Sequence, residues 1–183
     1  SDFTTEIKAR VSLHEPNIAT GKANPTPIQV ADQIEVLFSI VQGKPGDAYR
    51  GESIYSTRCG SCHKLFFKGG AVGPDLTRYQ RDDLPTMLHS IVAPSAEIRE
   101  GYETVIAKTA DGRILSGFLA EDDANAVVLR GVDGSNTTLA REDIEDLSPV
   151  GRSLMPPGLL SGLDDQQLRD LFAYLKIPQP ITK

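Results

Sequence analysis

Apolar residues recur at helical spacing in several stretches of this chain, and polar residues stand where they could cap the first turn. These patterns predict helices over 31–42, over 47–58 with Asp47 as cap, over 82–92 with Asp82 as cap, and from a cap at Asp164 to a stop at Pro178. Residues 64–80 contain Gly69, Gly70, Gly73 and Pro74, a composition typical of a loop.

The period of the pattern changes near Gly101. Short runs rich in Val, Ile and Leu predict strands over 102–108, 113–119, 126–130, 137–139 and 144–147. Asp111-Gly112 and Asp133-Gly134 are typical signals of hairpin turns. Residues 101–147 are therefore predicted to form a small antiparallel β insert of about four or five strands, which could close into a small barrel.

Composition and charge narrow the class of protein. The chain has 183 residues, of which 39% are hydrophobic, and a net charge of −6. This length allows one domain with its own core, or one domain that carries a small second lobe, and the acidic balance argues against nucleic-acid binding. No run of 18 apolar residues is present, so no transmembrane helix is predicted. The chain begins at Ser1 without a signal-peptide pattern, which predicts a mature product or a piece of a longer protein.

The sharpest chemical signal is the run Cys59-Gly60-Ser61-Cys62-His63. Two thiols on one helical turn can add to the two vinyl groups of a haem, and the following histidine then lies under the iron. The motif predicts one covalent haem c, bound through Cys59 and Cys62, with His63 as an iron ligand.

Three other interpretations of the motif compete. Half of a structural zinc site would need two further ligands, and His14 and His89 are not arranged as a second pair. A thioredoxin-type dithiol is expected after a strand, whereas a predicted helix precedes Cys59. The third alternative is a chance match.

Further positions extend the signal beyond the motif. Gly51 and Tyr55 precede Cys59, Leu171-Phe172-Ala173-Tyr174-Leu175-Lys176 lies in the last predicted helix, and Gly73-Pro74-Asp75-Leu76 follows His63. With these residues the chain resembles class I cytochrome c. The resemblance implies that the two helices cross closely at Gly51, that Tyr55 and Tyr174 fill the corner, and that the Pro74 carbonyl accepts a hydrogen bond from His63 Nδ1.

A narrower resemblance covers residues 46–177. It rests on the stretches GPDLT (73–77), PSAEI (94–98), GYET (101–104), DGR (111–113) and SLMPPGL (153–159). The chain is similar here to the haem-binding domain of planctomycete and verrucomicrobial proteins. That resemblance implies a domain at the C-terminus of a larger secreted protein, behind a dehydrogenase-like propeller or helical-repeat region.

The resemblance also implies the second iron ligand. The chain has two methionines, and Met155 lies in the Pro-rich loop before the last helix, where class I cytochromes keep their axial methionine. Met87 is predicted to pack in the core and His89 to lie at the surface or against a loop. A histidine ligand or a vacant sixth position are the alternatives. Arg78, Tyr79 and Arg152 are candidate donors to the haem propionates, or solvated surface residues.

The predicted fold is mainly α: a class I cytochrome c helical fold interrupted by the β insert at 101–147. The predicted divisions are a tail with a short helix (1–45), the cytochrome domain (46–177) and a C-terminal tail (178–183).

The predicted function is electron transfer, with no catalytic residue and no enzymatic activity. The expected partner is a redox protein, such as a dehydrogenase domain of the same full-length protein. Because thioether attachment takes place outside the cytoplasmic membrane, the expected location is periplasmic or otherwise extracytoplasmic. A haem sensor or peroxidase-like enzyme with a labile sixth ligand, and a zinc-stabilised interaction module, are the alternative functions.

Overall fold

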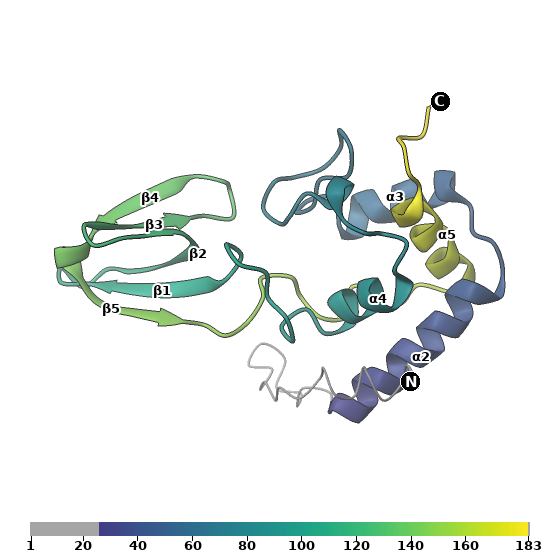
Figure 1. Cartoon of the computed structure of the whole chain (residues 1–183), viewed down its shortest axis with the longest axis horizontal. Coiled ribbons are helices and arrows are strands. Elements are labelled where there is room, and N and C mark those ends of the chain that lie inside the picture. The colour runs from purple at the N-terminus through teal and green to yellow at the C-terminus, as the bar shows by residue number, and fades with distance from the viewer. Residues whose placement is uncertain (1–25, 183) are drawn as a thin grey trace.

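The computed structural model describes residues 26–182. Most of the predicted N-terminal tail, including His14, lies outside these residues. The elements in chain order are α2 (Pro27–Gly43), α3 (Ala48–Arg58), the 3-10 helix η1 (Leu76–Arg78), α4 (Leu84–Val92), β1 (Thr104–Thr109), β2 (Ile114–Asp122), β3 (Ala126–Arg130), β4 (Asn136–Ala140), the 3-10 helix η2 (Arg141–Asp143), β5 (Ile144–Pro149) and α5 (Asp165–Lys176). Figure 1 shows the helices at one end of the molecule and the sheet at the other.

Side-chain caps determine where the helices begin. Asp47 accepts hydrogen bonds from the backbone N–H groups of Tyr49 and Arg50, which confirms the predicted start of α3. Asp164 forms a capping box with Gln167 at the start of α5, as its position predicted.

The predicted cap of α4 was wrong by one residue. Asp83, not Asp82, is the N-cap, because its carboxylate accepts hydrogen bonds from both the backbone N–H and the hydroxyl of Thr86. Pro85 has no N–H to donate and would stand third after a cap at Asp82, whereas a cap at Asp83 places the Thr86 N–H in that position.

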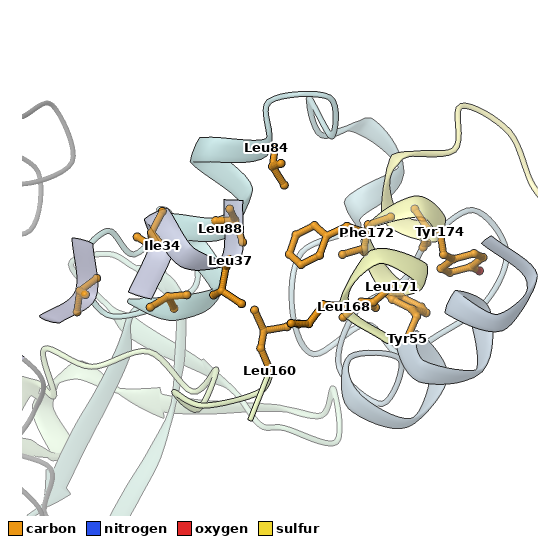
Figure 2. Packing of buried hydrophobic residues seen from close by; sticks show 14 of the residues in the cluster. Ile34, Leu37, Tyr55, Leu84, Leu88, Leu160, Leu168, Leu171, Phe172 and Tyr174 are labelled. Carbon is orange, nitrogen blue, oxygen red and sulfur yellow. The ribbon is translucent and has the colours of Figure 1, made fainter. Parts of the chain in front are cut away.

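The helices enclose one hydrophobic core, shown in Figure 2. Helices α3 and α5 cross closely at Gly51, where an added Cβ atom would lie 1.9 Å from the carbonyl oxygen of Asp170. The rings of Tyr55 and Tyr174 meet beside this crossing, with centroids 5.3 Å apart. Both features of the crossing that the family resemblance implied are therefore present.

A buried carboxylate joins the same two helices at the edge of the crossing. Asp170 on α5 accepts hydrogen bonds from Asp47 N at 2.7 Å, from Arg50 Nε at 2.8 Å and from Gln166 Nε2 at 2.7 Å. Burial alone favours the neutral acid, but these donors outweigh it and hold the pKa of Asp170 below its ordinary value.

The five strands form one antiparallel sheet in the order β4-β3-β2-β1-β5. Gly112 and Gly134 both have positive φ, as expected from their positions in the predicted hairpin turns. The sheet has a core of its own, separate from that of the helices, and its buried members are Val105, Ala107, Val127, Leu129 and Leu139.

The predicted fold class was wrong. Within residues 26–182 the structure is 35% helix and 21% strand, so the sheet is a substantial part of it rather than a small insert in a mainly α fold. The strand ends explain part of the error: β2 continues through Ala120, Glu121 and Asp122, which are exposed and lack the apolar alternation that marks a half-buried strand. Backbone pairing extends the ladder beyond the hydrophobic pattern.

Candidate functional site

The cysteine motif lies at the C-terminal end of α3. Cys59 is the C-cap of the helix, and its N–H donates to Tyr55 O at 2.8 Å. The N–H groups of Cys62 and His63 then both donate to Cys59 O, at 3.1 and 2.9 Å, so the motif continues as one tight turn. Neither cysteine is in a disulfide; Cys59 is half-buried and Cys62 is exposed. Both thiols are therefore presented from a single turn of backbone.

The imidazole of His63 is held by the residues that follow the motif. Its Nδ1 lies 3.0 Å from the carbonyl oxygen of Pro74. A carbonyl can only accept, so this bond places the ring proton on Nδ1 and leaves Nε2 as the lone-pair nitrogen for a metal. This is the hydrogen bond that the resemblance implied.

The close approach of Gly73 to the His63 ring explains why a glycine precedes Pro74. A Cβ atom on Gly73 would lie 2.6 Å from Cε1 and 2.8 Å from Nδ1 of the His63 ring. The backbone of the loop therefore lies directly against the imidazole, and any larger residue would displace the ring or the loop.

The loop after the motif is fastened to it by backbone hydrogen bonds. Gly70 N donates to Gly60 O at 2.9 Å, and Gly73 N donates to Cys62 O at 2.8 Å. Tyr55 adds a side-chain bond, because its hydroxyl donates to His63 O at 2.6 Å. Burial raises the pKa of Tyr55, so the hydroxyl stays a donor at neutral pH. The sequence pattern predicted Tyr55 as a packing residue and carried no signal for this hydrogen bond.

The electrostatic setting of Cys59 keeps its thiol protonated. Burial, followed by the neighbouring charge of Cys62, raises the pKa of Cys59 to about 11. A thiol in this state is a weak nucleophile and a poor metal ligand until it is deprotonated.

The loop between β5 and α5 carries Met155. The residue is half-buried and its backbone N–H donates to Ser153 Oγ at 3.1 Å. Met155 therefore lies in an irregular loop shortly before the last helix, and its pairing with His63 across a haem stays a prediction. Met87 packs against the helical core. His89 is only 6% exposed, so of the two predicted positions the surface one is wrong, and packing against a loop stays a prediction.

Two of the candidate propionate donors, Arg78 and Tyr79, lie at the end of η1, and the third, Arg152, lies in the loop that carries Met155. Tyr79 is 39% exposed and its hydroxyl accepts a hydrogen bond from Arg99 at 2.6 Å. The Arg99 guanidinium also lies over the Tyr79 ring, 5.2 Å from its centroid. Arg78 is exposed at the end of η1, and Arg152 is half-buried in the Met155 loop. Sequence reasoning missed Arg99, because its link to Tyr79 joins distant segments.

The donor set fits a covalently bound haem better than a protein-held metal ion. Two unpaired thiols and an imidazole with Nε2 available for a metal stand on one tight turn of backbone. Within residues 26–182, no three or more Cys, His, Asp or Glu side chains are grouped so as to hold a metal ion.

No helix within residues 26–182 is long and apolar enough to cross a membrane.

Comparison with protein families supports this class of site. Residues 48–129 match the family model described as Cytochrome c. The match covers the cysteine motif, the loop that holds His63, the first two strands and most of β3; it spans less than half of the chain and ends before Met155. No curated protein matches the chain.

The match supports a class I cytochrome c domain that binds haem and transfers electrons. The family implies a covalently bound haem c and a redox partner, and its domains are usually extracytoplasmic. Its members are typically electron carriers rather than enzymes.

Proposed function

We propose that this chain is a monohaem c-type cytochrome in which Cys59 and Cys62 hold the haem and His63 and Met155 bind its iron. The observation that carries the proposal is the hydrogen bond between His63 Nδ1 and Pro74 O beside the cysteine turn. It orients the imidazole and frees Nε2, as metal-binding histidines require.

Electron transfer is the activity that this ligand set favours. When bound, the haem iron takes up and releases one electron. His63 and Met155 together would leave the bound iron no open position for oxygen or peroxide, and the thioether of Met155 would raise the reduction potential by favouring ferrous iron. The residues that hold His63 in place are Pro74, Gly73 and Tyr55. The proposed donors to the propionates are Arg78 and Tyr79.

The wider assignment follows from the resemblance of residues 46–177 to planctomycete and verrucomicrobial haem-binding domains. The proposed cytochrome domain contains the sheet region 101–147 and is flanked by 1–45 and 178–183. The proposed donor is a dehydrogenase, such as a neighbouring domain of the same full-length protein. The proposed location is the periplasm or the cell exterior, where the thioether bonds are made.

The first test is the absorption spectrum of protein matured with haem, oxidised and reduced with dithionite. The expected result is a sharp reduced α-band and a weak far-red band in the oxidised form, from the bond between methionine sulfur and ferric iron. Met155→Ala should abolish the far-red band, while the matched control Met87→Leu should keep it. A band that persists in Met155→Ala would overturn the ligand assignment and point to Met87, whereas a high-spin spectrum would favour a sensor or a peroxidase-like enzyme.

The second test concerns the attachment. Cys62→Ala should leave a haem with one thioether bond, and the double variant Cys59→Ala/Cys62→Ala should lose its haem on extraction with acidified acetone. Unchanged retention in the double variant would contradict covalent attachment. A colourless preparation from a host with a working haem-attachment system, combined with bound zinc, would favour the interaction module instead.

A further inference from the structure

The loop that carries Met155 is fastened on both sides of the methionine. On its N-terminal side, Ser153 N donates to Ser95 Oγ at 3.1 Å. On its C-terminal side, Leu159 O and Ser161 O both accept from Arg58 Nη1, at 3.4 and 3.2 Å. The two anchors come from different parts of the chain, one after α4 and one at the end of α3.

The serine anchor reaches Met155 itself. Ser95 Oγ fixes the backbone of Ser153, and Ser153 Oγ in turn accepts the backbone N–H of Met155 at 3.1 Å. All three residues are half-buried. This series of hydrogen bonds ends on Met155, which directly precedes two prolines. It therefore restricts the direction in which the Met155 side chain points away from the loop backbone.

The arginine anchor joins the loop to the cysteine turn. Arg58 is the last residue of α3 and directly precedes Cys59. Leu160, between the two carbonyls that Arg58 binds, is 8% exposed and belongs to the helical core. Figure 2 shows it pointing toward Leu37 and Leu168. The loop is thus held by the same helix end that carries the proposed haem attachment.

We infer that Ser95, Ser153 and Arg58 are positioning residues that control how often the Met155 thioether leaves the iron. The inference rests on the proposed His63/Met155 ligation. Gly151 and Gly158, on either side of Met155, both adopt positive φ, so the loop backbone turns sharply at these two points. Loss of one hydrogen bond would favour the detached state of the methionine, in which the sixth position of the iron is open.

The probe for the detached state is imidazole, which binds ferric iron only where the sixth position is open. In haem-loaded protein, Ser153→Ala and Ser95→Ala should each bind imidazole about fivefold more tightly, as expected for the loss of one net hydrogen bond. Both variants should also lose the far-red band at a lower pH than the wild type. Ser153→Thr keeps the hydroxyl and should restore wild-type binding. Arg58→Met should act in the same direction as the serine variants.

Matched controls are available on the elements that flank each serine. Ser90 Oγ donates to Thr86 O within α4, and Ser148 Oγ donates to Asp146 on β5. Ser90→Ala and Ser148→Ala remove comparable hydrogen bonds outside the Met155 loop, so they should leave imidazole affinity unchanged. Thermal unfolding of every variant separates a change in ligation from a general loss of stability.

The outcomes distinguish this inference from the proposed function. If the wild type shows a far-red band that Met155→Ala removes, but the anchor variants bind imidazole like the controls, the inference is overturned and the ligand assignment stands. A lower melting temperature with unchanged imidazole affinity has the same meaning. If the wild type has no such band, the ligand assignment fails and the inference fails with it.

Discussion

The helical part and the sheet of this molecule divide its chemistry between them. Residues 101–149 contain no Cys, His or Met, yet they hold ten acidic and four basic side chains and so account for the whole net charge of −6. The helical part contains every thiol, imidazole and thioether of the described residues. Among the described residues, the thiols for covalent haem attachment and the His or Met ligands for its iron therefore come from the helices and their loops, while the sheet contributes shape and charge.

The two parts also differ in how they are held together. The sheet has aliphatic packing and backbone ladders, whereas the helices depend on a close backbone crossing, a tyrosine pair and a buried carboxylate. Changes placed in one part or the other can therefore test whether these are two cores or one cooperative unit.

The largest effects are expected from truncating one leucine in each core. Leu171 is 0% exposed in the helical core and Leu129 is 2% exposed in the sheet core. Each Leu→Ala variant should lose about 2–5 kcal/mol of unfolding free energy, because the lost apolar contacts leave a cavity. Hydrogen exchange resolved by region should show loosening of the helices in Leu171→Ala and of the strands in Leu129→Ala. Equal loosening of both parts by either variant would mean a single cooperative core.

A smaller effect is expected at the helix crossing. Gly51→Ala should cost about 1–3 kcal/mol of unfolding free energy, because its Cβ atom would overlap Asp170 O and push α3 away from α5. The control is Gly43→Ala at the end of α2, where no atom lies within 4 Å of the added Cβ; it should leave stability unchanged or raise it slightly. Denaturant unfolding would measure both. A Gly51→Ala variant as stable as the wild type would contradict the close crossing.

The buried carboxylate should give a pH-dependent effect. Asp170→Asn should lower the unfolding free energy by about 1–3 kcal/mol at neutral pH, through loss of charge-assisted hydrogen bonds. Because the folded pKa of Asp170 is lowered, its contribution is present above the unfolded value of about 3.9 and disappears as the pH falls through the folded pKa. Unfolding at pH 7 and pH 3 should therefore show the difference from the wild type shrinking in acid. Asp165→Asn, in the first turn of the same helix, is the control and should change stability little.

The smallest effect is expected at the surface of the sheet. Lys108 Nζ on β1 lies 2.7 Å from Glu145 Oε2 on β5, and the two side chains are 55% and 48% exposed. Glu145→Gln should cost at most about 1 kcal/mol of unfolding free energy, with the cost falling as salt is added. Denaturant unfolding at low and high salt would check this. A larger, salt-independent loss would show that charge, and not only packing, holds the sheet together.

Much of the local structure could be predicted from the residue pattern. The caps at Asp47 and Asp164, the hairpin turns at Gly112 and Gly134, and the existence of all five strands follow from local chemistry: a side chain that accepts an N–H, or a residue that tolerates positive φ. The thiols and imidazole of the motif are adjacent in the chain, so their spacing alone predicts one turn that presents all three.

The residue pattern could not predict how large a share of the structure the sheet forms. Nor could it predict three sets of contacts: the hydrogen bond from the Tyr55 hydroxyl to His63, the pairing of Tyr79 with Arg99, and the anchors of the Met155 loop. Each of the anchors and the Tyr79–Arg99 pair joins residues far apart in the chain. Such contacts exist only after the helices and strands have packed, because packing determines which distant polar groups come within hydrogen-bond range. Local pattern thus specifies the elements and the haem motif, and long-range packing specifies what holds them in place.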